Sequence, residues 1–422
     1  MVRALFIPLL LVALSACGGR IVPPSPVSRA QAPAPFKSSA PPTGSSAIKI
    51  ERATPIAPVA AVAGTGATAI KTGVVAGPSF DSLGLSAGSA KRALAAFRLS
   101  CPSVTKRADV SGLTAPEDWK AACAAAASWS NDDALGFFAS QFDVAQIGNG
   151  AAFATGYWEP EIAGSRVRIP GYDVPVYRRP ADLVEIDLGR FSEALKGKKI
   201  RGKISGDTFI PYADRTAIEQ GALAGRGLEI AWVASAVDFF VLQVQGSGRL
   251  RAPDGTIMRI GYDSQNGHDY TGIGKIMRDR GLLAPGKATM QGIVEYINAN
   301  PEQGRAIMRE NKSWVFFREV TGPGPLGALG VPVTGRASVA ADPLFTPLGA
   351  PVILSMDRAE ANGIWVAQDI GGAIKGANRF DTFWGAGDEA GQIAGGMSAR
   401  GTAWLLLPKG VVARITNAVP TP

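Results

Sequence analysis

The hydrophobic pattern of the chain changes from helical to strand-like spacing near Phe153. Before that point, apolar residues recur three and four positions apart, which predicts helices at 89–99, 115–128 and 132–142. After it, short apolar runs predict strands at 174–177, 229–233 and 239–244. Helical spacing returns at 272–280, 291–298 and 301–310. Strands then resume at 314–317, 351–354, 363–367 and 403–407.

Composition supports a strand-rich fold. The 422 residues include 51 glycines and 30 prolines, which favour turns and short strands over long helices. The length allows two domains, or one domain with a large insertion. We therefore expect a mainly β protein of the β-rich α+β class, with barrel-like sheets rather than a doubly wound sheet.

The N-terminus reads as an export signal. Arg3 is followed by a short apolar run, and residues 14–17 (Leu-Ser-Ala-Cys) match a bacterial lipobox. This predicts a signal peptide at 1–16 and acylation of Cys17, and the alternative is a plain signal peptide cut near Ala16. Gly18 favours the outer membrane. The Pro- and Ala-rich stretch 17–79 predicts a disordered tether, with folding from residue 80.

Cys101 and Cys123 remain as a pair once Cys17 is assigned to the lipid. An oxidising compartment favours a disulfide between them, which would close a loop of about twenty residues and stabilise the fold by ~3 kcal/mol. The alternative is two buried free thiols.

Charge and motif content exclude several classes of protein. The net charge of +8 is spread along the chain, whereas nucleic-acid binders concentrate it, so attraction to an anionic polymer or surface is the safer inference. His268 is the only histidine, so a His-based metal cluster is impossible. The sequence contains no Walker A motif, and the glycines at 322–327 are interrupted by prolines. We expect no cofactor and no metal, and a structural role for His268.

Catalysis by carboxylate side chains is the chemistry that these exclusions leave open. Asp369 ends an apolar strand and Asp381 follows twelve residues later, beside Phe380, Phe383 and Trp384. An apolar setting keeps a carboxyl protonated near neutral pH, as a general acid requires. Asp369 either raises the pKa of Asp381 or caps the turn at 371–372, and an ordinary turn-stabilising role is the alternative for each carboxylate.

Two further stretches carry polar groups in apolar surroundings. Residues 156–160 place Glu159 after Tyr157 and Trp158, and residues 243–248 end an apolar run with amides, glycines and a hydroxyl. Such groups suit recognition of hydroxyl and acetamido groups. The alternative for 243–248 is a strand end followed by a hairpin turn.

Together these segments resemble the membrane-bound lytic murein transglycosylase A family. The similarity is carried by residues 156–160, 243–248, 315–318, 340–342 and 369–387, and it extends over about 101–408. The resemblance implies a double-psi β-barrel domain built from 80–160 plus 311–422. A second β-barrel domain, 161–310, would be inserted into it, with the glycan in the groove between them.

The resemblance also implies a reaction. Members of the family are lytic exotransglycosylases that cleave the β-1,4 bond between N-acetylmuramic acid and N-acetylglucosamine and leave a 1,6-anhydro sugar. The family motif places a single acid and base at Asp381, with Asp369 and Lys375 in supporting roles. If the loop at 376–380 were misaligned with that motif, Asp388 would be the nearest substitute for Asp381. The expected groove residues are Tyr157, Trp158, Glu159, Gln245, Gly246, Ser247, Asp342, Gly371, Gly372, Trp384 and Asp388.

The implied setting is a monomeric lipoprotein on the periplasmic face of the outer membrane. Its partners would be peptidoglycan glycan strands and, through the lipid anchor, the membrane, with no nucleic acid. Two rival functions stay open. One is a non-catalytic, expansin-like wall-binding lipoprotein, and the other is a peptidoglycan hydrolase.

Overall fold

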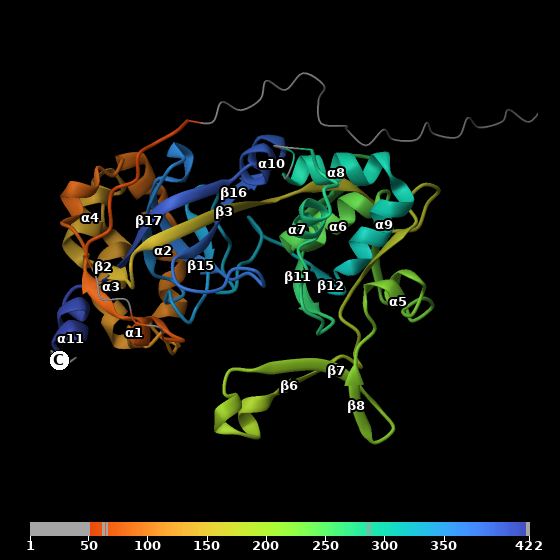
Figure 1. Cartoon of the computed structure of the whole chain (residues 1–422), viewed down its shortest axis with the longest axis horizontal. Coiled ribbons are helices and arrows are strands. Elements are labelled where there is room, and N and C mark those ends of the chain that lie inside the picture. The colour runs from red at the N-terminus through yellow and green to blue at the C-terminus, as the bar shows by residue number, and fades with distance from the viewer. Residues whose placement is uncertain (1–50, 61–63, 65, 285–286, 288, 419–422) are drawn as a thin grey trace, which may run out of the picture. The chain divides into compact units, whose positions relative to one another are not determined.

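A computed structural model describes residues 51–60, 64, 66–284, 287 and 289–418. The expected signal peptide, Cys17 and the tether up to residue 50 lie outside the described residues. The described chain is mainly β with a closed barrel, further sheets and short helices (Figure 1), which confirms the expected fold class.

Six strands close into a barrel in the order β3-β16-β13-β15-β14-β17, because β17 pairs with both β14 and β3. The neighbours are antiparallel except for β13–β15 and β16–β3. Two strands extend the sheet from β17: β2 (Phe142–Ile147) and then β1 (Val74–Ala76). The barrel strands are β3 (Ala151–Glu159), β13 (Ser338–Ala341), β14 (Pro351–Met356), β15 (Gly363–Asp369), β16 (Arg379–Ala386) and β17 (Ser398–Pro408).

The continuous apolar runs of β14, β15 and β17 are explained by burial of both strand faces. Alternate residues such as Leu354, Trp365 and Leu405 point into the barrel core. Their neighbours Ile364 and Trp404 pack in a second core between the barrel wall and the N-terminal helices. Successive side chains of a strand point to opposite faces, so a strand between two cores is apolar throughout.

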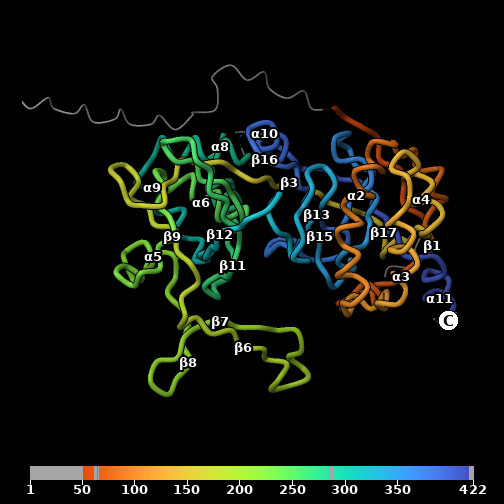
Figure 2. The backbone as a smooth tube through the Cα atoms, turned by 180° about the vertical axis from the view of Figure 1, so that it is seen from behind, coloured from red at the N-terminus to blue at the C-terminus, as the bar shows by residue number. Residues whose placement is uncertain are grey.

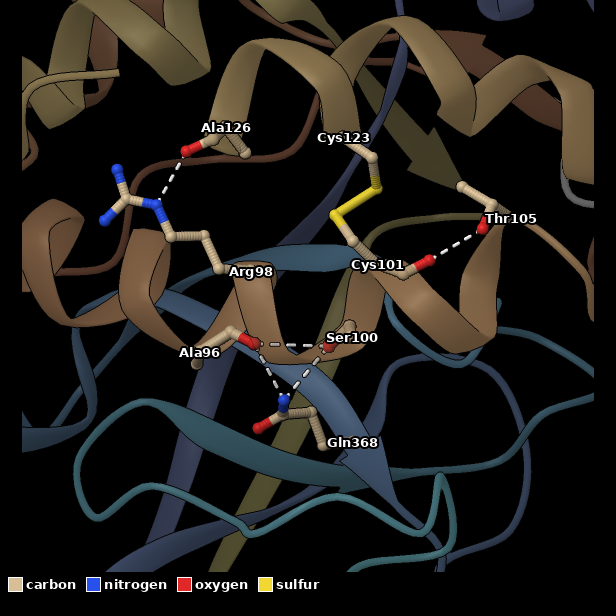
Figure 3. Close-up of a disulfide and its surroundings, with 8 residues drawn as sticks. All are labelled: Ala96, Arg98, Ser100, Cys101, Thr105, Cys123, Ala126 and Gln368. Carbon is tan, nitrogen blue, oxygen red and sulfur yellow. Dashed lines mark hydrogen bonds between the residues drawn. A yellow bond between two sulfur atoms is a disulfide. The ribbon is translucent and has the colours of Figure 1, made fainter. Parts of the chain in front are cut away.

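Helices α2 (Ala87–Val104), α3 (Lys120–Ser128) and α4 (Ala134–Gln141) form that outer layer where helices were predicted, with α2 against β15 (Figure 2). Cys101 of α2 and Cys123 of α3 form a disulfide with Cα atoms 5.5 Å apart (Figure 3).

Beside the disulfide, the fully buried Gln368 joins β15 to α2. Its Nε2 donates to Ala96 O (2.8 Å) and Ser100 Oγ (3.0 Å), as Figure 3 shows. Since Gln368 immediately precedes Asp369, α2 helps to fix the end of β15.

A second sheet lies between β3 and β13 in the sequence, with strand order β12-β11-β10-β4-β9-β5. Its edge strands β12 and β5 also approach each other, so the sheet curls on itself around its own core. Its strands are β4 (Glu161–Ser165), β5 (Val174–Tyr177), β9 (Glu229–Val233), β10 (Ser247–Arg251), β11 (Ile257–Gln265) and β12 (Val315–Glu319).

One strand predicted in this part of the chain is wrong. Residues 239–244 belong to helix α6 (Ala236–Gln245), which begins where Ser235 Oγ accepts from Asp238 N (3.1 Å). The helix ends at Gly246, whose φ of 79° suits glycine. Because α6 packs Phe239 into one core and Phe240 into another, apolar residues lie on two of its faces and obscure the helical periodicity.

Helices α7 (Ile273–Asp279), α8 (Met290–Ala299) and α9 (Pro301–Glu310) pack with α6 around the second of these cores, where helices were predicted. A separate three-stranded sheet contains β6 (Val184–Asp187), β7 (Lys199–Ser205) and β8 (Thr208–Pro211). The remaining helices are α1 (Ala69–Thr72), α5 (Arg215–Glu219), α10 (Asp388–Gly395) and α11 (Val411–Ala418).

Two boundaries differ from those expected. The packed chain begins before residue 80: β1 pairs with β2, and Val59 exchanges hydrogen bonds with the Gln146 amide (2.8 and 2.9 Å). At the other boundary, β12 pairs with β11 and not with the barrel, so residues 315–319 belong with the inserted sheet rather than with 311–422. Strands β1 and β12 are short, so their pairing with other strands, rather than their own sequence pattern, determines which part of the fold they join.

None of the helices in the described part of the chain is both long and apolar enough to cross a membrane.

Candidate active site

Asp369 and Asp381 lie on either side of β13. Ala340 in that strand is the Cα partner of both, because β13 pairs with β15 on one edge and with β16 on the other. Two strand spacings separate the backbones of the two acids by about 10 Å. The barrel therefore brings together two carboxylates that stand twelve residues apart in the sequence.

Asp381 is held by a side chain of the neighbouring strand β3. Thr155 is its Cα partner, and Thr155 Oγ1 donates to Asp381 Oδ1 (2.5 Å). Arg379 Nη2 donates in turn to Thr155 Oγ1 (2.9 Å), and the guanidinium lies 4.8 Å from the centre of the Phe153 ring. The result is a relay from a cation through a hydroxyl to the carboxyl.

Burial raises the pKa of Asp381 to about 6. The Thr155 hydrogen bond and the Arg379 charge oppose this rise, and the charge of Asp369 adds to it. Asp381 as a whole residue is half-buried. A carboxyl with a pKa near 6 can both donate and accept a proton near neutral pH, as a general acid and base must.

Both carboxyl oxygens of Asp369 already accept hydrogen bonds. Tyr157 Oη donates to Oδ2 (3.0 Å), and the backbone N–H groups of Ala328 and Ile370 donate to Oδ1 (3.0 and 2.9 Å). Burial raises the pKa of Asp369 to about 6 despite these bonds. Burial and the two nearby carboxylates also raise the pKa of Tyr157 well above its usual value, so this hydroxyl stays a donor.

The loop between the two acids is fixed at both ends. Gly371 O accepts from Ile374 N (3.1 Å) in a tight turn, and the buried Asp342 accepts from Gly376 N through Oδ2 (2.8 Å). Asp342 also accepts from Leu344 N (3.1 Å), so its role in the structure is to hold this loop.

The inserted part of the chain contacts the barrel near the site. Gln245, the last residue of α6, accepts from Trp158 N through Oε1 (3.2 Å). Ser247 is buried at the start of β10, after Gly246. Tyr270 follows β11, and a Cβ added to Gly372 would lie 3.9 Å from its Cβ. Residues of both parts therefore meet around the Asp369–Asp381 loop.

Two predicted groove residues are buried for other reasons. Glu159 is 1% exposed and its Oε1 accepts from Arg259 Nε (2.7 Å), which makes it half of an ion pair between β3 and β11. Trp384 is 5% exposed in the barrel core, where its Nε1 donates to Thr382 Oγ1 (2.9 Å). Neither offers a face to a ligand, since their aromatic and acidic character serves packing and pairing.

Three further predicted residues are exposed or half-buried. Lys375 and Asp388 are exposed, the latter at the start of α10, and Trp158 is half-buried. Their roles stay predictions.

Three residues were missed at the sequence level. Arg379 and Thr155 stand two positions before Asp381 and Tyr157, and residues two apart share a face of a strand. That spacing is a signal that could have identified both. Tyr270 lies in an irregular loop of the insert, where the sequence offers no periodicity. Burial, followed by the Asp381 charge, raises the pKa of Tyr270.

Within the described ranges, no group of three or more His, Cys, Asp or Glu residues could hold a metal ion. His268 Nε2 lies 2.8 Å from the backbone oxygen of Tyr212, in keeping with a structural role.

Two family models match successive parts of the chain. A family model described as the MltA-specific insert domain matches residues 153–318, and one described as the 3D domain matches residues 337–407. Membrane-bound lytic murein transglycosylase A of Vibrio cholerae is 34% identical over 203 residues, which are 46% of this chain. The chain thus spans about half of that relative, 55% of its length.

Solved structures cover more of the chain. MltA from Neisseria gonorrhoeae is 34% identical with a TM-score of 0.67, over 84% of this chain and 96% of that one. Escherichia coli MltA with bound chitohexaose is 28% identical with a TM-score of 0.57, over 80% of this chain and 94% of that one. The chain belongs to the membrane-bound lytic murein transglycosylase A family.

Proposed function

We propose that this protein cleaves the β-1,4 bond between N-acetylmuramic acid and N-acetylglucosamine in peptidoglycan without using water. Asp381 is the single acid and base, and the product ends in a 1,6-anhydromuramyl sugar. The observation that carries the proposal is the Asp381 carboxyl, whose pKa is about 6 and which the Thr155 hydroxyl orients.

In the first step Asp381 donates its proton to the glycosidic oxygen while the bond from that oxygen to muramyl C1 breaks. Positive charge develops at C1, and Asp381 becomes a carboxylate. Thr155 stabilises this ionised state because it donates to Oδ1.

In the second step the muramyl C6 hydroxyl attacks C1, and Asp381 takes the proton of that hydroxyl. The new O6–C1 bond replaces the broken one, Asp381 returns to its protonated state, and no water is consumed. The same carboxyl acts twice, so no second carboxylate is needed at the spacing of ordinary glycosidases.

The hydrogen bonds to Asp369 make it unsuited to proton transfer, and this supports the assignment of that role to Asp381. Its oxygens accept from Tyr157 and from two backbone N–H groups. We assign it the role of orienting Tyr157 and the Gly371–Gly372 turn. Lys375, Trp158, Gln245 and Ser247 remain candidate contacts of the glycan.

The chitohexaose complex of the E. coli relative supports a glycan ligand. Chitohexaose is a β-1,4-linked chain of N-acetylglucosamine units, so it has the backbone of the peptidoglycan strand.

Mass spectrometry of digested peptidoglycan tests the proposal. We expect anhydromuropeptides, which are lighter by one water than hydrolase products, and none of them from an Asp381→Asn variant. Reducing-end muropeptides would indicate a hydrolase, and intact sacculi after long incubation would indicate a wall-binding protein.

We also propose that the chain is a monomeric lipoprotein, anchored through Cys17 to the periplasmic face of the outer membrane. The lipobox at 14–17 supports this. Cys17→Ala should release the protein from the membrane fraction, and retention there would mean that another feature anchors it.

A further inference from the structure

A cavity of about 450 Å³ lies beside the catalytic carboxyl, within the inserted part of the chain. Thr155 and Arg379 of the barrel and Tyr270 of the insert line its catalytic end. From there it extends between helices α6, α7 and α8. It is thus continuous with the relay that holds Asp381, and its volume is in the range of ordinary ligand pockets.

Apart from Lys275, the walls away from Asp381 are apolar. They include Val241 and Val244 from α6, Ile273 from α7, and Ile293 from α8. A sugar ring would lose the hydrogen bonds of its hydroxyls to water against such walls, at a cost that buried methyl groups do not incur. The cavity therefore suits methyl and methylene groups rather than another saccharide unit.

The end of the cavity near Asp381 is polar. Arg379 donates to Thr155 Oγ1 and to the backbone oxygen of Phe380, and a guanidinium carries five N–H donors in all. The Tyr270 side chain is 42% exposed at the same end. These groups can hydrogen-bond amide carbonyls at the entrance while methyl groups lie deeper.

One part of the proposed substrate combines these features. Muramic acid carries a lactyl ether on C3, and an amide joins the lactyl carboxyl to a short peptide that begins with alanine. This substituent leaves the ring two carbons from C1, so it lies within a few bonds of the bond that Asp381 would cleave. It offers one methyl group on the lactyl unit, another on the alanine, and amide carbonyls between them.

Resting on the function proposed above, we propose that this cavity binds the lactyl group and first stem residues of the muramyl unit, which makes the enzyme selective for peptide-bearing strands. Stem recognition then occurs next to the reacting bond and contributes to the rate of cleavage.

Two substrate pools test this selectivity. One is solubilised glycan with its stems, and the other is the same glycan after an amidase has cut the lactyl–alanine bond. The rate of anhydromuramyl product formation, as kcat/KM, is measured on both for the wild type and for Ile293→Trp, which fills the cavity from α8. Asn298→Ala, on the exposed side of α8, is the matched control.

We expect the wild type to prefer stem-bearing strands by about fourfold, as burial of the alanine methyl implies, because the lactyl methyl is present in both pools. Ile293→Trp should lose this preference, and an unchanged circular dichroism spectrum would show that it folds. Val244→Phe, which fills the cavity from α6, should behave in the same way.

Equal wild-type rates on the two pools would overturn the proposal, as would a filled variant that keeps the preference. Competition by a free fatty acid without any stem preference would instead assign the cavity to lipid. A wild type that forms no anhydro product from either pool would remove the proposed function itself, and that outcome is distinct from the others.

Discussion

The carboxyl of Asp381, the proposed catalytic group, should lower the stability of the fold that holds it. Burial raises the pKa of Asp381 from 3.8 to about 6, so the folded state binds its proton more tightly than the unfolded chain does. The stabilisation from the protonated form is fully present below pH 4. It is lost as the pH rises through about 6, where the buried group ionises.

The size of the effect follows from the shift. Two pH units correspond to about 3 kcal/mol, and the accessible part of the residue reduces this to an expected range of about 1–3 kcal/mol. Asp381→Asn keeps the shape of the side chain and an oxygen that can accept from Thr155, but it cannot ionise. The variant should therefore be more stable than the wild type by that amount at pH 7, and equally stable at pH 4.

Urea denaturation followed by tryptophan fluorescence, at intervals from pH 4 to 8, measures this difference. Asp388→Asn is the control, because it removes an exposed carboxyl in the first turn of α10. The difference for Asp381→Asn should grow between pH 4 and 6, and the control should show no such growth. A constant difference across that range would refute the reasoning, and near-full turnover by the variant would refute the catalytic assignment.

Three further predictions concern the surroundings of the site. Thr155→Val removes a donor to the ionised catalytic carboxyl, so the alkaline limb of the pH–rate profile should move up by about one pH unit, whereas Thr155→Ser should leave it in place; an unmoved limb in the valine variant would contradict this. Glu159→Gln leaves Arg259 without its buried partner and should lower the free energy of unfolding by ~3 kcal/mol, measured in urea. A loss below ~1 kcal/mol would contradict this prediction. Replacing Cys101 and Cys123 together by alanine should cost ~3 kcal/mol and make thermal unfolding insensitive to reductant; equal melting temperatures of wild type and variant would show that the bridge is not stabilising.

Sequence reasoning identified those elements whose own pattern decides their structure. The helices α2 to α4 carry their apolar residues on one side, and β14, β15 and β17 are short apolar runs bounded by turns. It failed at α6, because a helix that packs into two cores has apolar residues on two faces, and its apolar run imitates a strand.

For the site, the motif was sufficient to find Asp381 and Asp369, but it could not separate a groove residue from a buried one. Glu159 and Trp384 have suitable chemistry in the sequence, and only the fold reveals that Arg259 and the barrel core engage them. Tyr270 reaches the site through the packing of the insert against the barrel, which no local pattern encodes.

The disulfide between α2 and α3 has a consequence for when this protein becomes functional. Cys101 directly follows Ser100, which with Ala96 holds Gln368, the residue before Asp369. In a reduced chain, α2 would lack its covalent link to α3, and the layer that fixes the end of β15 would be weaker. A chain built in this way reaches its full stability only after oxidation, so an exported copy would mature after it has left the reducing compartment in which it is made.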